Sequence, residues 1–223
     1  MCIARGLQGD LTPFAGRPPA GSMNAASGAE RIAERVLAAR KRLGHDILTA
    51  VDDTTDHFNH LVTRLPADQA ETAGYHPGNI LSIRTFVGLR LLEVVIHGWD
   101  IRSQLEPSAP LSPESAAVLV GFWPEFIAWG FRPEPTLSTA ARYRFAFTGD
   151  VPHPYDIVVE GQTVRMEPAG EHAAHVTLHC AAATFVLLMC GRYRLDTLIT
   201  TGQVTVEGER GLVAAFGKWF QGM

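Results

Sequence analysis

Apolar residues recur at helical spacing through the first half of the chain. Between residues 28 and 65 they return every three or four positions, which predicts a helix. The consecutive Asp52-Asp53-Thr54-Thr55 are poor helix formers, so we expect a kink or a break there. Between residues 80 and 105 the same period is stronger, and it predicts a second helix capped by Asn79.

A third helical segment is expected from Pro113 to Phe131. Ser112 is a typical N-cap residue, and a proline directly after it suits the first helical position. Pro124 should break or kink this segment, because proline cannot donate the backbone hydrogen bond of a helix interior.

The hydrophobic period changes from 3.6 to 2 beyond a proline-rich linker at residues 132–139. We therefore place a boundary between a helical domain, residues 1–135, and an α+β domain, residues 136–223. In the second domain the pattern predicts strands and helices in the following order: strand 143–147, strands 157–159 and 164–166 joined by a hairpin, strand 176–179, helix 181–190, strand 203–207 and helix 210–220.

Composition limits the classes of partner. Of the 223 residues, 46% are hydrophobic and 19% are charged, which is enough apolar material for one large or two small cores. A net charge of -4 offers no field to attract a polyanion, so we expect no nucleic acid partner. The longest apolar runs are too short or too interrupted to span a bilayer, and three cysteines make no disulfide framework. These features predict a cytoplasmic protein with no membrane association.

The most informative window for chemistry is residues 90–101. Glu93 and His97 are four positions apart in the strongest predicted helix, so they share one face and can form half of a metal site. Asp100 lies three positions further on and can accept the other ring N–H of His97. By spacing alone, an ordinary exposed ion pair is a more common explanation of Glu93 and His97 than a metal site.

The string Leu92-Glu93-Val-Val-Ile-His97-Gly-Trp99-Asp100-Ile101 resembles the signature of the mycothiol-dependent maleylpyruvate isomerase family, within the wider group of DinB-like four-helix bundles. Residues 198–208 and 212–220 are similar to the end of a sterol-carrier-like domain, which these proteins often carry behind the bundle.

The resemblance implies an α+β fold, with an N-terminal DinB-like helical bundle that is incomplete, followed by a small sterol-carrier-like domain. It implies that Glu93 and His97 bind a divalent metal, zinc in most members, and that mycothiol is the thiol cosubstrate. The implied activity is that of an isomerase or S-transferase that acts on a small electrophile. The alternative is a non-catalytic or degenerate member that binds a small apolar ligand. Neither catalytic residues nor thiol-binding residues can be assigned from the sequence.

The sequence departs from the family pattern at its start. The family's first two bundle helices, one of which carries a further histidine ligand, should precede the Pro/Gly-rich loop at residues 11–26, and we expect them to be missing. Two protein ligands are fewer than a zinc site normally has. His57 and His60, or more weakly His76, are the substitutes that the chain offers. An incomplete bundle should also expose apolar surface, so we expect self-association, most simply as a homodimer that rebuilds the missing layer and supplies a histidine in trans.

Other polar and aromatic residues have ordinary structural interpretations. Three histidines in the second domain are expected at the surface, two cysteines as buried thiols, and five aromatic residues as core. Three arginines could clamp a dicarboxylate, although such residues are more often surface charges. The histidines are His172, His175 and His179; the cysteines are Cys180 and Cys190, both placed in an apolar helix; the aromatic residues are Phe122, Trp123, Phe126, Trp129 and Phe131; and the arginines are Arg192, Arg194 and Arg210.

Overall fold

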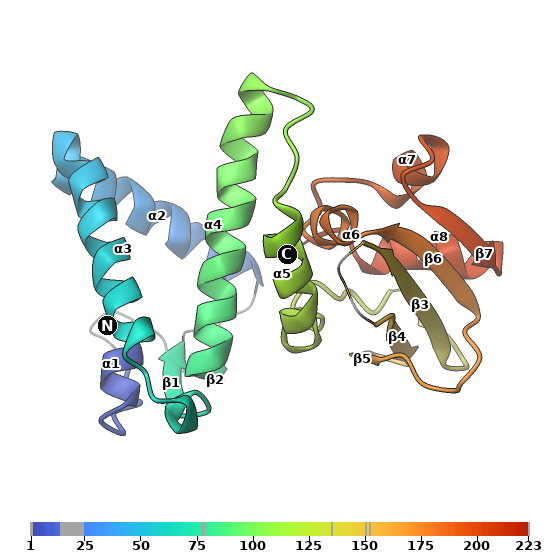
Figure 1. Cartoon of the computed structure of the whole chain (residues 1–223), viewed down its shortest axis with the longest axis horizontal. Helices are drawn as coiled ribbons and strands as arrows, with labels where there is room; N and C mark the ends of the chain where they lie inside the picture. Colours follow the sequence, from blue (N-terminus) through green and yellow to red (C-terminus); the bar gives the residue numbers. More distant parts are fainter. Residues whose placement is uncertain are drawn as a thin grey trace. The chain divides into compact units, whose positions relative to one another are not determined.

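The computed structural model describes residues 2–13, 25–76, 79–134, 136–149, 151 and 153–222, with the side chains of residues 2 and 25–32 excepted. Most of the loop expected at residues 11–26 therefore lies outside the described residues. The chain divides into two compact units, Met1–Leu89 and Arg90–Met223 (Figure 1).

The first unit is mainly helical. Its elements are α1 (Cys2–Gly6), α2 (Ala25–Leu43), the short 3-10 turn η1 (Gly44–Asp46), α3 (Ile47–Thr63), a second 3-10 turn η2 (Ala67–Gln69), and the antiparallel strands β1 (Ala73–His76) and β2 (Asn79–Ser82). A Cβ atom at Gly6 would collide with the carbonyl of Ala73, so glycine lets α1 approach β1 closely.

The helix predicted over residues 28–65 breaks at η1 and not at Asp52. Gly44 has a φ of 54°, a left-handed conformation that ends α2 and that glycine adopts without strain. The predicted position was wrong because the polar run stays helical: Thr54 donates its hydroxyl to the carbonyl oxygen of Ala50 at 2.7 Å.

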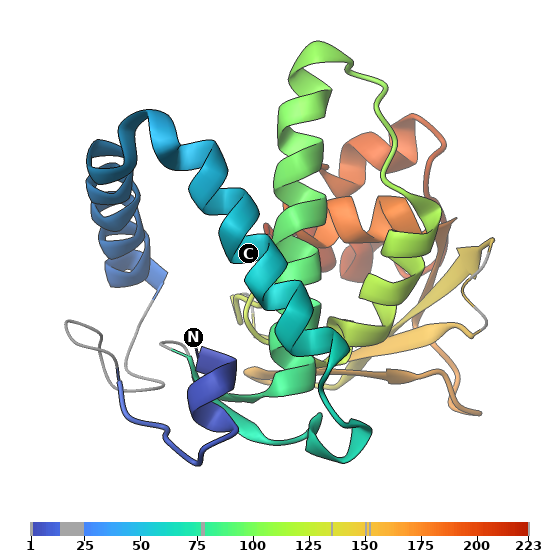
Figure 2. The same ribbon diagram turned by 60° about the vertical axis from the view of Figure 1, so that its left-hand side comes forward.

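The next helix begins later than predicted. Asn79 lies in β2 opposite His76, so it does not cap the helix. The cap is Ser82, whose hydroxyl oxygen accepts the backbone N–H of Thr85 at 3.1 Å. Helix α4 (Ile83–Leu105) then runs unbroken to the predicted end, as the long green helix of Figure 2 shows. It crosses the boundary between the two units.

The second unit starts with the rest of α4 and continues into α5 (Pro113–Phe126). The predicted cap is confirmed, since the Ser112 hydroxyl accepts the backbone N–H of Ser115 at 3.1 Å. Pro124 lies inside α5 without breaking it. The predicted extension to Phe131 was wrong, because the helix ends at Phe126, two residues after the proline.

A five-stranded sheet forms the centre of the second unit. Its strands are β3 (Ala141–Thr148), β4 (Tyr155–Glu160), β5 (Thr163–Pro168), β6 (Val176–Ala181) and β7 (Thr205–Gly208), in the spatial order β5-β4-β3-β6-β7. Only the β3–β6 pair is parallel. Gly161, with a φ of 58°, forms the predicted hairpin between β4 and β5. The fold class is α+β, as predicted.

Three helices accompany the sheet: α6 (Ala182–Met189), α7 (Leu195–Thr200), which the sequence analysis missed, and α8 (Arg210–Trp219). Alternate residues of β3 are buried, and they meet aromatic side chains of α6 and α8. The ring centroids of Tyr143 and Phe216 lie 5.1 Å apart, and those of Phe145 and Phe185 lie 4.9 Å apart. Trp123 of α5 extends this core, 5.4 Å from Phe185. An aromatic layer thus fills the space between the sheet and these helices.

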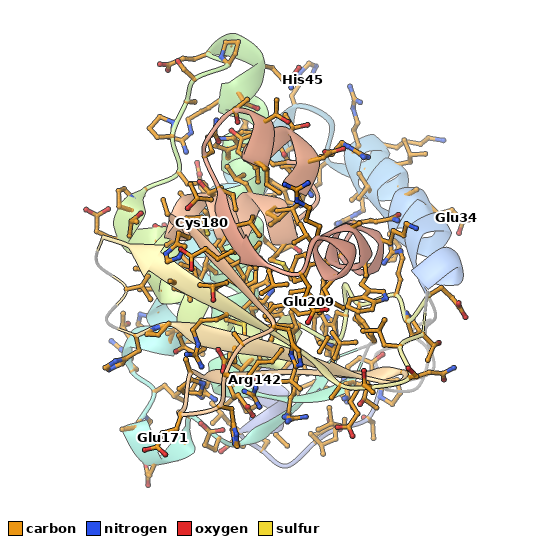
Figure 3. All side chains as sticks on the ribbon, turned by 90° about the vertical axis from the view of Figure 1, so that its right-hand side faces the viewer. Glu34, His45, Arg142, Glu171, Cys180 and Glu209 are labelled. Atoms are coloured by element: carbon orange, nitrogen blue, oxygen red, sulfur yellow. The ribbon has the colours of Figure 1, made fainter. Side chains whose placement is uncertain are left out.

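The opposite face of the sheet carries a charged network around Asp156, whose side chain is wholly buried. Arg142 donates to the Asp156 carboxylate at 2.9 Å and to Glu167 at 2.9 Å. Arg144 donates through two nitrogens to Asp156, at 2.8 and 2.9 Å. Figure 3 labels Arg142 on this network. Because every charge here has a partner, the network holds three neighbouring strands together.

Candidate functional site

The face of α4 that carries Glu93 and His97 forms a polar cluster in the second unit. His97 Nε2 lies 3.2 Å from Glu93 Oε2, and His97 Nδ1 lies 3.1 Å from Asp100 Oδ2. The predicted contact between His97 and Asp100 is therefore present. The adjoining face anchors the helix, because Leu92, Ile96 and Trp99 are buried and the Trp99 indole donates to the carbonyl oxygen of Ala109 at 2.8 Å.

A fourth side chain reaches this cluster from a distant part of the sequence. Arg192, in the turn after α6, donates through Nε to Asp100 Oδ1 at 3.0 Å and through Nη2 to Asp100 Oδ2 at 2.6 Å. Its Nη1 donates to the carbonyl oxygen of Cys190 at 2.7 Å. Carboxylate, imidazole, carboxylate and guanidinium thus form one continuous chain of contacts, which we call the Glu93–Arg192 cluster.

The backbone around Arg192 is fixed by two glycines. Gly191 has a φ of 72°, and a Cβ atom there would lie 2.6 Å from the carbonyl oxygen of Gln221. Gly222 approaches Gly191 from the other side with a φ of 106°. Only glycine lets these two backbone segments pass so closely, so residues 221–222 hold the turn from which Arg192 reaches Asp100.

Ion pairing sets the electrostatics of the cluster. Hydrogen bonds from Arg192, and a weaker contribution from His97, lower the pKa of Asp100 although partial burial opposes the shift. Asp100 in turn raises the pKa of Arg192. Asp100 therefore stays a carboxylate at neutral pH and accepts hydrogen bonds from both neighbours.

The cluster is accessible to solvent on the side of α4. The side chains of Glu93 and His97 are 60% and 62% exposed, whereas that of Arg192 is only 26% exposed. Tyr193 packs edge-on against Trp99 at a centroid separation of 5.9 Å and covers the other side. The Glu93 carboxylate and the His97 imidazole are thus accessible to solvent, and less exposed residues hold the cluster in place.

Glu93 and His97 offer donor atoms that suit zinc, but catalytic zinc normally has three protein ligands. Among the described residues, no group of three His, Cys, Asp or Glu side chains is arranged to hold a metal ion. Glu93 and His97 by themselves therefore do not form a complete zinc site.

The candidate substitute ligands all lie in the first unit. His57 and His60 lie exposed on α3, and His76 lies in β1, where its ring contacts Phe86 at 5.8 Å. In the second unit, His175 Nδ1 accepts the backbone N–H of Arg142, and His179 Nε2 lies 3.6 Å from Glu207 Oε1. The contacts of His76, His175 and His179 are ordinary structural ones.

Both described cysteines are buried, as predicted, although Cys180 lies in β6 and Cys190 follows α6. Burial raises the pKa of each thiol to about 12, so neither is a ready nucleophile. Of the candidate arginines, Arg194 pairs at the surface with Asp196 at 3.0 Å. Three N–H groups of Arg192 donate hydrogen bonds to Asp100 and Cys190, so the guanidinium is not available to bind a dicarboxylate.

The aromatic residues expected as core divide into two groups. Trp123 and Phe126 are fully buried, as predicted, whereas Trp129 is 41% exposed.

Arg192 is among the candidates predicted from the sequence, but its pairing with Asp100 is not. The two residues are 92 positions apart, and no local spacing links them.

Two family models match separate parts of the chain. Residues 4–102 match the family model of the mycothiol maleylpyruvate isomerase N-terminal domain. Residues 134–221 match the family model of the SCP-2 sterol transfer family. No curated protein sequence matches the chain. The α+β architecture, a helical region followed by an SCP-2-like domain, is the predicted one.

Three solved structures show weaker likeness. The stereoselective inverting sec-alkylsulfatase Pisa1 from Pseudomonas sp. is 14% identical over 46% of this chain and 16% of its own length, with a TM-score of 0.40. The UbiJ-SCP2 ubiquinone synthesis protein is 16% identical over 47% of this chain and 89% of its own, with a TM-score of 0.37. The sterol carrier protein domain 2 of Helicoverpa armigera is 13% identical over 50% and 91%, with a TM-score of 0.35. This chain thus spans about a sixth of the sulfatase, and TM-scores this low carry no functional weight.

Proposed function

We propose that the chain is a thiol-dependent isomerase or S-transferase acting on a small electrophile, because residues 4–102 match the mycothiol maleylpyruvate isomerase N-terminal domain and residues 134–221 match the SCP-2 sterol transfer family. The observation that carries the proposal is the Glu93–Arg192 cluster. It joins the family's signature helix to the turn after α6 through a two-point ion pair.

Within this proposal Glu93 and His97 are two protein ligands of a divalent metal, zinc by family resemblance. Zinc would supply a thiolate at neutral pH by lowering the pKa of a bound thiol, mycothiol in this family. The proposal assigns only these two protein ligands, since no group of three such side chains is arranged to hold a metal among the described residues.

The roles of the surrounding residues follow from their contacts. Asp100 accepts from His97 Nδ1 and fixes the ring so that Nε2 faces Glu93. Arg192 fixes Asp100 in turn, which makes both of them positioning residues. A thiol chemistry of this kind suits a reducing compartment, and the free Cys180 and Cys190 agree with a cytoplasmic location.

Metal binding tests the proposal most directly. Calorimetric titration of zinc should show one site that Glu93→Gln and His97→Ala each weaken by at least about tenfold. His179→Ala is the matched control, since His179 also lies beside a glutamate, Glu207, but outside the cluster. Zinc binding that neither Glu93→Gln nor His97→Ala weakens would contradict the assignment, and so would the absence of binding.

Activity needs a separate assay with mycothiol and maleylpyruvate. We expect turnover that depends on added thiol and is lost in His97→Ala. If zinc binds at Glu93 and His97 but maleylpyruvate is not converted, the site assignment stands and the substrate is a different electrophile.

Binding of a small apolar ligand is the second candidate function, and the match of residues 134–221 to a sterol transfer family favours it. Mass spectrometry of the denatured protein would reveal a copurified lipid, and titration with a fluorescent fatty acid would measure uptake. Saturable uptake by wild-type protein, unaffected by His97→Ala, would favour this function over the first.

A further inference from the structure

The hairpin formed by α2 and α3 exposes an apolar surface, which we call the hairpin face. Val36 and Leu37 of α2 are 59% and 66% exposed, and Leu48 and Val51 of α3 are 73% and 52% exposed. Helix α3 has 17 residues and buries none of them. A helix of this length is marginally stable without tertiary packing, and soluble monomers rarely leave such a surface uncovered.

The charges beside these apolar residues differ in sign between the two helices. The last turn of α2 carries Arg40, Lys41 and Arg42, whereas Asp52 and Asp53 lie in the middle of α3. All five side chains are exposed, and none forms an ion pair with another residue in the described part of the chain.

Within one copy, the cationic last turn of α2 does not lie opposite Asp52 and Asp53 of α3. The cationic turn of α2 directly precedes η1, and the first turn of α3, which contains Leu48, directly follows it. Figure 2 shows the two blue helices joined at this short turn. The cationic turn thus lies beside apolar residues of its own α3, while Asp52 and Asp53 lie further from η1.

A second copy in the antiparallel orientation corrects this mismatch, and we propose that the hairpin face is a homodimer interface. In this arrangement the α2 helices of the two copies are antiparallel, so α2 of one copy runs parallel to α3 of the other. One register sets Val36 beside Leu48 of the second copy, Ala39 beside its Val51, Arg40 beside its Asp52 and Lys41 beside its Asp53, because each pair is separated by 12 positions in the sequence. A twofold axis then repeats every contact.

The helical period supports the same register. Val36, Ala39 and Arg40 are spaced by three and four positions and share one face of α2. Leu48, Val51 and Asp52 have the same spacing on α3. A single face on each helix therefore presents the apolar and the charged partner together, as a self-complementary interface requires.

Light scattering and sedimentation over a range of protein concentrations test the proposal. Wild-type protein should be a dimer, and Leu48→Glu should weaken dimerisation by at least about tenfold because a carboxylate then faces an apolar partner. Val118→Glu is the matched control: Val118 is a 51% exposed apolar residue of α5, outside the hairpin face. Circular dichroism should show equal helix content in wild type and Val118→Glu.

Charge reversal distinguishes the register from a general effect on folding. Arg40→Asp with Lys41→Asp gives two acidic helices, and Asp52→Lys with Asp53→Lys gives two basic ones. Each double variant should be monomeric alone, whereas a mixture of the two should form heterodimers in which both contacts are complementary.

Wild-type protein that stays monomeric at all concentrations would overturn the proposal. A dimer that is unaffected by Leu48→Glu, or double variants that fail to pair in the mixture, would overturn it as well.

Discussion

The guanidinium of Arg192 donates two hydrogen bonds to the carboxylate of Asp100, from Nε to Oδ1 at 3.0 Å and from Nη2 to Oδ2 at 2.6 Å. The pair closes a polar chain that begins at Glu93 and passes through His97. Its geometry depends on a planar, forked donor, which lysine lacks.

Arg192→Lys should therefore destabilise the protein by about 1 kcal/mol, since one of two charge-assisted hydrogen bonds is lost at a partly exposed site. Urea denaturation at neutral pH measures this loss. Arg194→Lys is the control: its partner Asp196 is on the surface, and no measurable change is expected. Equal effects of the two substitutions would show that the two-point contact is not special.

The pattern of helices and strands could be predicted from the sequence because it rests on local periodicity. The end of α4 at Leu105 and the cap at Ser112 were both predicted in this way. Errors occurred where tertiary contacts outweigh local preference. Asn79 pairs with His76 across a hairpin and so does not cap a helix, and the break between α2 and α3 follows the left-handed Gly44.

The candidate site shows the same division. The contact of His97 with Glu93 and with Asp100 follows from helical spacing of four and three positions. The partner of Asp100 could not be predicted, because Arg192 reaches it through the packing of α4 beside the turn after α6. Side-chain exposure along α3 is likewise a tertiary property that periodicity does not reveal.

Stability should depend on pH through Asp156. Burial alone would raise the pKa of this carboxyl, but hydrogen bonds and charges from Arg144 and Arg142 outweigh it and lower the pKa below its ordinary value of 3.8. A lowered pKa in the folded state means that the stabilisation is complete above about pH 4 and is lost as the pH falls toward the folded pKa.

Asp156→Asn should cost about 3 kcal/mol at pH 7, because two arginines lose their buried partner. The difference from wild type should shrink below pH 4, where the aspartate itself becomes protonated. Urea denaturation at pH 7 and pH 3 measures both values. Asp196→Asn, at an exposed ion pair, should have a smaller effect at pH 7. A cost that is independent of pH would mean that Asp156 acts through packing alone.

Gly191→Ala should destabilise the turn that presents Arg192. The substitution combines a left-handed φ of 72° with a Cβ atom 2.6 Å from the carbonyl oxygen of Gln221. Gly202→Ala is a close control, because Gly202 has a φ of 74° and open space around the added atom. Strain alone should cost about 1 kcal/mol at Gly202, and the collision should add about 1 kcal/mol at Gly191. Thermal unfolding of both variants measures the difference, and equal costs would show that the end of the chain moves aside.

Phe185→Ala should open space for an apolar ligand in the second unit. The Phe185 ring is wholly buried, with centroids 5.4 Å from Trp123, 4.9 Å from Phe145 and 5.4 Å from Phe147. Truncation should cost about 3 to 5 kcal/mol of stability. The cavity, lined by aromatic rings, should stay dry and bind a small apolar probe such as benzene.

Thermal shift measurements with and without benzene test this expectation, with Trp129→Ala as the control because Trp129 is 41% exposed and its removal leaves no enclosed cavity. Benzene should stabilise Phe185→Ala and leave both wild type and the control unchanged. If benzene stabilises wild type as strongly, space for a ligand already exists beside the aromatic layer, and the sterol-carrier function gains support over the thiol chemistry. If it stabilises none of the proteins, the layer closes around the missing ring, and the cost of truncation should then fall toward the lower end of its range.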